Sequence, residues 1–258
     1  MSDSTDAEFG TMAAWTADAV DALGHRHALP AACRGSGTPA ALTWLLERLH
    51  VTSDEPLLDV GAGVGGPAAF ARDTVGAIPL AVEPMHDANE ASRRLFGLDS
   101  ITASAEHLPV CSGRFRHAWA LGVLSTADDP GAALREAARV LGPDGRLGLL
   151  VYLRSARHLA DEPTGTHFLA EDQLADDLAA AGLDVVDHVP MASVDDAPRG
   201  WDDRATAVAE WIEAHHGGED AWGKAQESET SIGRLLRDHF VVAHLLVARR
   251  QHAERTTR

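Results

Sequence analysis

The sequence predicts one α/β domain with a doubly wound, mostly parallel sheet of seven strands, an antiparallel last strand and a helical lid. Three observations predict this fold. Short apolar segments alternate with amphipathic helical segments, a glycine-rich turn follows the first of them, and a long polar stretch interrupts the alternation before the last one. With 258 residues, 45% of them hydrophobic, the chain can bury one large core.

The N-terminal residues 1–50 are predicted to form a tail followed by a helical cap. Residues 1 to about 10 are polar and acidic, which favours a disordered tail, and residues 12–23 carry an apolar pattern of helical period that includes Trp15. Thr38 and Pro39 then predict the start of a helix over 40–49, because threonine caps helix N-termini and proline suits the first turn.

The core of the domain is predicted over 51–192 and 237–252. A short apolar strand at 57–60 leads directly into the glycine turn. Alternation at this spacing indicates parallel strands joined by right-handed crossovers. The other strands are expected at 78–82, 101–103, 117–121, 147–152, 185–189 and 240–248, with helices between most of them, notably at 87–95, 130–141 and 171–181.

A helical insertion is predicted over 193–236, where the alternation stops. This stretch is polar and carries Trp201, Trp211 and Trp222. Aromatic side chains here and at Trp15 can line a pocket for a flat or apolar ligand, or they can pack the helices onto the core. Both alternatives stay open at this point.

The net charge and the number of cysteines indicate which binding partners and which cellular compartment to expect. A net charge of -17 disfavours nucleic acid and anionic membranes, which are held mainly by clustered Lys and Arg. The acidic N-terminus does not resemble an export signal, no apolar run reaches the roughly 18 residues of a membrane span, and Cys33 and Cys111 are too few for a disulfide framework. We expect a soluble cytoplasmic protein; its oligomeric state stays open, with a homodimer as one option.

The glycine turn predicts a nucleotide-bearing ligand. Gly61, Gly63 and Gly65 stand where the backbone must turn sharply and where a ligand can approach more closely than a Cβ atom permits. The same stretch also fits the spacing G-x-G-x-x-G through Gly66, so the glycines alone do not distinguish between the cofactors that bind at such turns.

Four segments, read in order, give the turn a context. They are Leu-Leu-Asp-Val-Gly-Ala-Gly-Val-Gly at 57–65, Ala-Val-Glu-Pro-Met at 81–85, Ala-Glu-His-Leu-Pro at 105–109 and Leu-Arg-Glu-Ala-Ala-Arg-Val-Leu-Gly-Pro-Asp-Gly-Arg-Leu at 134–147. In this order they resemble the motifs of the class I, Rossmann-like S-adenosylmethionine-dependent methyltransferases that act on small molecules. The resemblance covers about residues 35–190 well and the remainder more loosely.

The resemblance implies S-adenosyl-L-methionine as cofactor, S-adenosyl-L-homocysteine as product, and a role for each matching residue. The glycine turn and Asp59 before it would lie beside the methionine portion. Glu83, after the second strand, would accept hydrogen bonds from both ribose hydroxyls. The loop after the third strand, with Ser104, Ala105 and Glu106, would border adenine. The residues at the end of the fourth strand would flank the sulfonium. The implied set is Asp59, Gly61, Gly63, Gly65, Glu83, Ser104, Ala105, Glu106, Leu121 and Gly122.

Two departures from the family pattern bear on function. Ser104 stands where related sequences often carry an Asp, which puts the hydrogen bond to the adenine amino group in doubt. Relatives also often carry His just after the fourth strand, where this chain reads Gly-Val-Leu-Ser-Thr at 122–126. We therefore do not assign a general base to that position.

Methyl transfer is an in-line displacement, so the protein mainly has to align the acceptor and exclude water. A general base helps only when the acceptor is protonated, and His is the usual choice. His167 is the first candidate, because it follows the fifth strand at the edge where ligands bind in open α/β sheets, and His215 in the insertion is the second. The pairs His25/His27 and His215/His216 do not form a recognisable metal site, so no metal is predicted.

Two other functions share parts of this pattern. An NAD(P)-dependent oxidoreductase would share the glycine turn and Glu83, but the chain has no Tyr-x-x-x-Lys pair, since Tyr152 is its only tyrosine. A protein that binds S-adenosylmethionine without transferring methyl, as a cyclase, a rearrangement catalyst or a sensor, stays open. The acceptor is expected to be a small molecule, with a natural product or other secondary metabolite as one candidate; neither its identity nor the attacked atom (O, N, C or S) can be read from the sequence.

Overall fold

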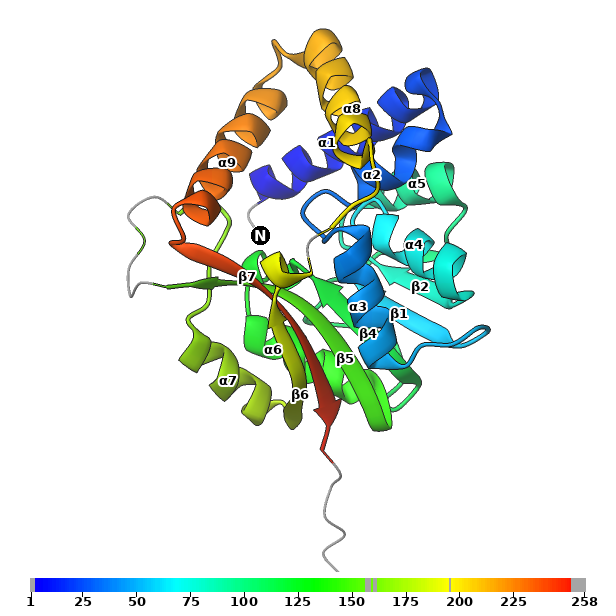
Figure 1. Cartoon of the computed structure of the whole chain (residues 1–258), viewed down its shortest axis with the longest axis vertical. Coiled ribbons are helices and arrows are strands. Elements are labelled where there is room, and N and C mark those ends of the chain that lie inside the picture. The colour runs from blue at the N-terminus through cyan, green and yellow to red at the C-terminus, as the bar shows by residue number, and fades with distance from the viewer. Residues whose placement is uncertain (1–2, 156–158, 160–161, 195, 252–258) are drawn as a thin grey trace, which may run out of the picture.

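The computed structural model describes residues 3–155, 159, 162–194 and 196–251 and contains a seven-stranded sheet with the order β3-β2-β1-β4-β5-β7-β6 (Figure 1). Neighbouring strands from β3 to β5 are parallel, and β7 is antiparallel to both β5 and β6. This confirms the predicted fold class. The strands are β1 Pro56–Val60, β2 Ile78–Val82, β3 Ser100–Ile101, β4 Phe115–Leu121, β5 Leu141–Arg154, β6 Leu183–Pro190 and β7 Val241–Arg250.

Helices cover both faces of the sheet, and a third group lies beyond the carboxyl ends of the parallel strands (Figure 1). The helix α3 packs on one face, and α6 and α7 pack on the other. The α-helices are α1 Asp3–Leu23, α2 Ala28–Ala32, α3 Pro39–Leu49, α4 Gly66–Val75, α5 His86–Phe96, α6 Pro130–Val140, α7 Glu171–Ala180, α8 Trp201–His216 and α9 Asp220–Arg237, and the 3₁₀ turns are η1 His25–His27, η2 Val123–Ser125 and η3 Met191–Ser193.

Local sequence explains where several of these elements begin and end. The Thr38 hydroxyl accepts a hydrogen bond from the Ala41 amide (3.4 Å) at the start of α3, as predicted. The Asp129 carboxylate accepts one from the Ala132 amide (2.8 Å) at the start of α6. Four of the five residues of β1 are buried, in agreement with a strand that is covered on both faces.

The N-terminal tail was predicted too long, because α1 already begins at Asp3 and only residues 1–2 of that segment lie outside the described residues. Acidic residues favour the first turn of a helix through the helix dipole, so a composition typical of a solvated tail also suits a helix start. Further along, α1 packs against α5, and a Cβ atom at Gly10 would lie 3.2 Å from the Asp87 carboxylate. Tertiary packing thus stabilises the helix beyond its own propensity.

Several strand boundaries also differ from the prediction, most of all that of the fifth strand. The third strand is confined to Ser100–Ile101, and the fifth begins at Leu141 rather than at 147. The early start of β5 coincides with a register shift of its β4 partner between Phe115 and His117 and with a left-handed backbone at Asp144 (φ 60°). An irregular strand entry of this kind leaves no alternating apolar pattern to read in the sequence.

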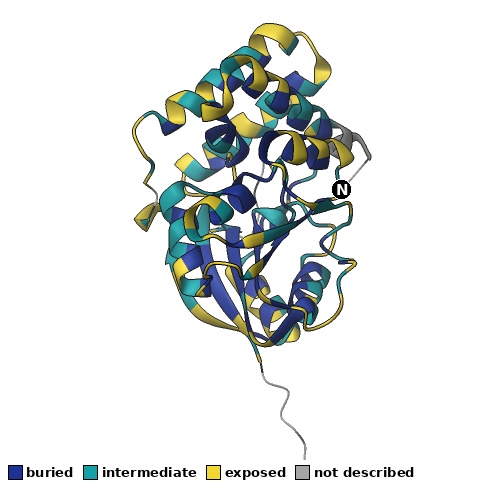
Figure 2. Cartoon of the chain, turned by 90° about the vertical axis from the view of Figure 1, so that its right-hand side faces the viewer, coloured by how far each residue is buried: buried dark blue, intermediate teal, exposed yellow. Residues whose placement is uncertain are grey.

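The insertion predicted at 193–236 forms the helices α8 and α9, which lie with α1 above the sheet (Figure 1). Figure 2 shows that the strands are largely buried, whereas the outward faces of these helices are exposed. Trp15, Trp201 and Trp222 are buried, so their side chains pack the helices together. No helix in the described ranges is both long and apolar enough to cross a membrane.

Candidate functional site

The glycine turn joins β1 to α4 at the carboxyl edge of the sheet. Its backbone is pinned to β2, because the amides of Gly61 (2.7 Å) and Ala62 (3.1 Å) both donate to the Val82 carbonyl. Gly61, Gly63 and Gly65 all have positive φ angles, of 68°, 53° and 83°. That backbone conformation favours glycine over any residue with a Cβ atom.

The glycines of the turn have different surroundings. A Cβ atom at Gly61 would lie 2.4 Å from Val123 Cγ2, and one at Gly65 would lie 2.3 Å from Ser92 Oγ. At Gly63, a Cβ atom would meet nothing within 4 Å among the described residues. Two of the glycines are therefore required by packing, whereas Gly63 faces open space where a ligand can approach the backbone.

Glu83, directly after β2, is 3% exposed and linked to the turn. Its Oε2 accepts a hydrogen bond from the Gly63 amide (2.8 Å), and its Oε1 accepts one from the Met85 amide (3.1 Å). Each carboxylate oxygen can accept a second hydrogen bond, so Glu83 can still serve a diol while it orders the turn.

Asn89 and Thr102 hold the backbone that carries Glu83. The Asn89 side-chain amide donates to the Glu83 carbonyl (2.8 Å), to the Met85 carbonyl (3.2 Å) and to Thr102 Oγ1 (3.2 Å). Sequence reasoning missed both residues. The available signal was a polar residue on the buried face of the predicted helix after β2, since Asn89 is 3% exposed.

Asp59 lies in β1, 1% exposed, and its Oδ2 has no hydrogen-bond partner within the described part of the chain. Burial is the main reason that the pKa of Asp59 is raised to about 8; the Glu83 carboxylate also raises the pKa, while the Trp119 indole and the Ala68 amide lower it. Asp59 is therefore mainly protonated at neutral pH.

The residues predicted to border adenine form a turn after β3. Ala105 is buried, Ser104 is half-buried, and the His107 amide donates to the Ser104 carbonyl (3.2 Å). Glu106 Oε1 accepts a hydrogen bond from the Asp128 amide (3.0 Å), which ties this turn to the loop after η2. The carboxyl ends of β3 and β4 are thereby held together.

The motif at 134–147, which begins within α6, also holds the next part of this loop in place. Arg139 donates to the carbonyls of Val110 (2.7 Å) and Leu108 (2.9 Å), and it pairs with Glu136. Glu136 in turn accepts a hydrogen bond from the Leu108 amide (2.9 Å). The motif at 134–147 therefore positions the 104–112 loop from outside the site.

Leu121 ends β4 in the core, and Gly122 follows with φ 81° and an amide that donates to the Leu150 carbonyl (2.9 Å). A Cβ atom at Gly122 would lie 3.3 Å from the Gly35 carbonyl oxygen and 3.7 Å from Tyr152 Cε2. The end of β4 is thus in close contact with the loop between α2 and α3. Sequence reasoning placed Tyr152 at a strand end but did not assign it to the site.

The two histidine candidates occupy different places. His167 is exposed in the loop between β5 and α7, and its amide donates to the Ser125 carbonyl (2.7 Å) just after β4. His215 is exposed on α8, where its ring stacks on Trp211 (3.8 Å between centroids) and its Nδ1 is bonded to the Trp211 carbonyl (2.7 Å). Of the two, His167 is the one linked to the end of β4.

The ten residues predicted to bind the cofactor come from β1 and β4 and from the loops that follow β1 to β4. Because parallel neighbouring strands end at the same edge, the residues at and after the strand ends form one continuous edge of the sheet. Within the described ranges, no group of three or more His, Cys, Asp or Glu side chains is arranged to hold a metal ion.

The strand order, the antiparallel β7 and the ordered edge residues define a class I methyltransferase fold. Residues 58–149 match the family described as a methyltransferase domain. The match spans nearly all of the four segments that resemble methyltransferase motifs.

Relatives of the sequence are methyltransferases by name. The chain is 37% identical over 112 residues to the methyltransferase GfsG of Streptomyces halstedii, which covers 41% of this chain and 40% of that protein. It is 34% identical over 142 residues to the 27-O-demethylrifamycin SV methyltransferase of Amycolatopsis mediterranei, which covers 51% of this chain and 50% of that protein. The matches span half or less of these relatives.

Solved structures share the fold over most of the chain. The [4+2]-cyclase SpnF superposes with a TM-score of 0.67 at 24% identity, covering 85% of this chain and 84% of that one. The geranyl diphosphate C-methyltransferase of Streptomyces coelicolor A3(2), solved with S-adenosyl-L-homocysteine, superposes with a TM-score of 0.61 at 15% identity, covering 81% and 74%. At these identities the likeness concerns the fold alone.

Proposed function

We propose that this protein binds S-adenosyl-L-methionine at the carboxyl edge of the sheet and transfers its methyl group to a small-molecule acceptor. The observation that carries the proposal is the bond between the buried Glu83 carboxylate and the Gly63 amide, beside open space at Gly63. It combines an acceptor for a ribose diol with a backbone that a ligand can approach. The names of the sequence relatives support methyl transfer.

The cofactor would supply a methyl group on a cationic sulfur, which leaves as a neutral thioether when the acceptor attacks. The residues of this chain then have three tasks. Glu83 and the glycine turn bind and orient the cofactor, and Gly122 allows the loop that contains Gly35 to pack closely against the end of β4. The helices α1, α8 and α9 act as the lid that excludes water from the acceptor.

His167 is the general base in this proposal for an acceptor that carries a proton. Its loop is held against Ser125, beyond the carboxyl end of β4, and its side chain is exposed. His167 would accept the proton that the acceptor loses when it attacks the methyl group of the cofactor. His215 is the weaker candidate because its ring is stacked on Trp211, with 3.8 Å between the ring centroids.

The acceptor we propose is a secondary metabolite, and the name of one relative makes a hydroxylated rifamycin-type compound the first class to test. Nucleic acid is an unsuitable acceptor for a chain with 39 acidic and 22 basic residues, not counting His. We also propose that the protein acts in the cytoplasm.

Calorimetry with S-adenosylhomocysteine, NAD⁺ and NADP⁺ tests the binding part of this proposal, and we expect binding of the first ligand alone. A radiolabelled methyl-transfer screen over hydroxylated macrocycles, small phenols and amines tests the reaction. Tight dinucleotide binding without a response to S-adenosylhomocysteine would support the oxidoreductase alternative. Binding of S-adenosylhomocysteine with no labelled product, while an incubated substrate rearranges, would favour a non-methylating role.

A further inference from the structure

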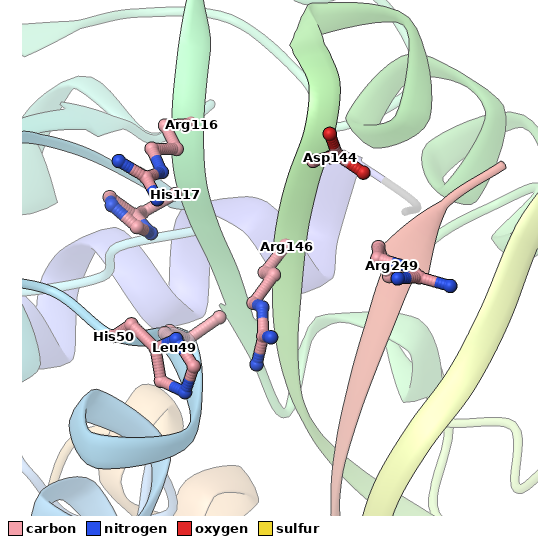
Figure 3. Close-up of a pocket in the computed structure, with 7 residues that line it drawn as sticks. All are labelled: Leu49, His50, Arg116, His117, Asp144, Arg146 and Arg249. Carbon is pink, nitrogen blue, oxygen red and sulfur yellow. The ribbon is translucent and has the colours of Figure 1, made fainter. Parts of the chain in front are cut away.

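A recess lies at the opposite edge of the sheet from the glycine turn. It is formed at the amino ends of β4 and β5, at the end of β7 and just after α3, and it has a volume of about 230 Å³ (Figure 3). Its lining includes Arg116, Arg146, Arg249 and His117. None of these residues belongs to the proposed cofactor site.

The strand register explains why these side chains meet. His117 of β4 pairs with Arg146 of β5, which pairs with Arg249 of β7. Directly paired residues project from the same face of a sheet, and neighbouring strands lie roughly 4.8 Å apart. The three side chains therefore form a row across the sheet, and in Figure 3 Arg146 stands between the other two.

His117 is an unusual member of this row. It is 1% exposed, and neither ring nitrogen has a partner in hydrogen-bond geometry within the described part of the chain. The nearest carboxylate oxygen, Glu55 Oε2, lies 3.3 Å from Nε2. Glu55 thus competes for Nε2, and because a neutral imidazole carries one N–H group, His117 offers a ligand in the recess at most one donor.

Acidic groups border the recess without filling it. Asp144 lines it and is exposed. Glu55 Oε1 lies 3.6 Å from Arg116, and Asp184, which pairs with Arg249 in register, accepts a hydrogen bond from the Gln251 side chain (2.7 Å).

Arg146 has N–H groups left to donate to a ligand. Arg146 donates to the Arg48 carbonyl (2.6 Å), which uses one of the five N–H donors of its guanidinium group. Three arginines in one recess are a local exception on a chain of net charge -17.

We propose that this recess binds a small phosphate-bearing anion. Guanidinium groups recognise phosphate through pairs of parallel N–H donors, and Arg249 and Arg116 are exposed at the rim, where they can close on such a group. Arg146 and His117 form the inner wall with Leu49. The volume admits a phosphate group together with a small attached body, so inorganic phosphate and a phosphate monoester share the chemistry required.

The test compares binding to the full-length protein by calorimetry at pH 7, with inorganic phosphate and ribose 5-phosphate as two separate probes at constant ionic strength. We expect saturable binding of at least one probe, and the stronger of the two identifies the source of the phosphate group. Arg249→Gln and Arg116→Gln should each weaken binding at least tenfold, because each removes a charged fork. Arg93→Gln, the same change on the exposed surface of α5, should bind as the wild type does.

Several results would overturn the proposal. The proposal fails if neither probe gives a binding heat greater than that of a sodium chloride control. It also fails if Arg249→Gln and Arg116→Gln both bind the probes with unchanged affinity. An equal loss in Arg93→Gln would reduce the effect to general electrostatics. If Arg249→Gln unfolds, Arg116→Gln decides, since its side chain is 70% exposed. Binding of S-adenosylhomocysteine should be unchanged in both rim variants, so this result stays separate from the proposed function.

Discussion

The Tyr152 hydroxyl donates a hydrogen bond to the Gly35 carbonyl oxygen (3.0 Å), which joins the end of β5 to the loop between α2 and α3. The same loop carries Arg34, which pairs with Glu229 of α9. Gly122 lies next to both residues, because a Cβ atom there would be 3.3 Å from the Gly35 carbonyl oxygen and 3.7 Å from Tyr152 Cε2. One loop is thus fixed to the sheet on one side and to a helix of the proposed lid on the other.

Tyr152→Phe should weaken binding of S-adenosylhomocysteine by roughly 2- to 12-fold, the loss expected for one neutral hydrogen bond. The ring is kept, so packing against the core is retained and only the fastening of the Gly35 loop is removed. Calorimetry measures the affinity, and the thermal unfolding midpoint checks that the fold is intact. Unchanged affinity would show that the loop does not contribute to the cofactor site.

Gly63→Ala and Gly97→Ala form a matched pair. Both glycines have positive φ angles, of 53° and 64°, and at both a Cβ atom would meet nothing within 4 Å in the described part of the chain. Each substitution should cost about 1–2 kcal/mol of stability, because an L-residue is strained in this conformation. Only Gly63→Ala should lower affinity for S-adenosylhomocysteine, by tenfold or more. Equal affinities in the two variants would remove Gly63 from the site.

Glu83→Gln should lower affinity for S-adenosylhomocysteine by roughly 5- to 150-fold, which corresponds to the loss of about 1–3 kcal/mol when a charged hydrogen-bond acceptor becomes neutral. The substitution keeps the size of the side chain, and an amide oxygen can still accept from Gly63. Binding is measured by calorimetry on protein whose circular dichroism matches the wild type. A Gln variant that binds normally would limit Glu83 to ordering the turn.

Asp59→Asn should alter the pH dependence of stability. The pKa of Asp59 is about 8 in the folded protein and about 3.9 in an unfolded chain, so the folded state binds more protons between these values. The free energy of unfolding contributed by this group is therefore fully present below about pH 3.9 and is lost as the pH rises through 8. Urea unfolding at pH 5, 6, 7 and 8 should show the wild type losing stability relative to the variant. A difference that does not change with pH would contradict the assignment.

His167→Ala should leave affinity for S-adenosylhomocysteine within about threefold and lower turnover of a protonated acceptor by roughly 10²-fold or more. The loss should shrink as the pH rises, because the acceptor then ionises by itself. His215→Ala is the matched control and should retain turnover, since its ring is stacked on Trp211. Undiminished turnover in His167→Ala would refute the base, and loss of cofactor binding would make it a structural residue.

The sequence predicts well those features that arise from short stretches of chain. The turn at Gly61 to Gly65, the acid at Glu83 and the turn at Gly122 each follow a predicted strand, and a parallel sheet aligns the ends of neighbouring strands. The helix starts at Thr38 and Pro130 have local capping signals. The start of α1 was missed because its acidic residues suit a tail and a first turn equally well.

Contacts between distant segments could not be predicted. Tyr152 and Gly35 are 117 positions apart, and nothing near either residue encodes the other. The row formed by His117, Arg146 and Arg249 depends on the register of three strands, one of them antiparallel. A shift of one residue in any pairing would turn that strand's side chain to the other face, and no local pattern fixes such a register.

The position of β7 determines when, during synthesis, the sheet can finish folding. This strand lies between β5 and β6, and it is the strand with which β6 pairs in the described sheet. During synthesis, residues 183–190 leave the ribosome about 50 residues before 241–250, and the chain grows at about 5–20 residues per second. For several seconds, therefore, β5 presents an open edge where its last neighbour will insert. A newly made chain is most exposed to mispairing with another copy in that interval, and a chaperone that shields strand edges would act there.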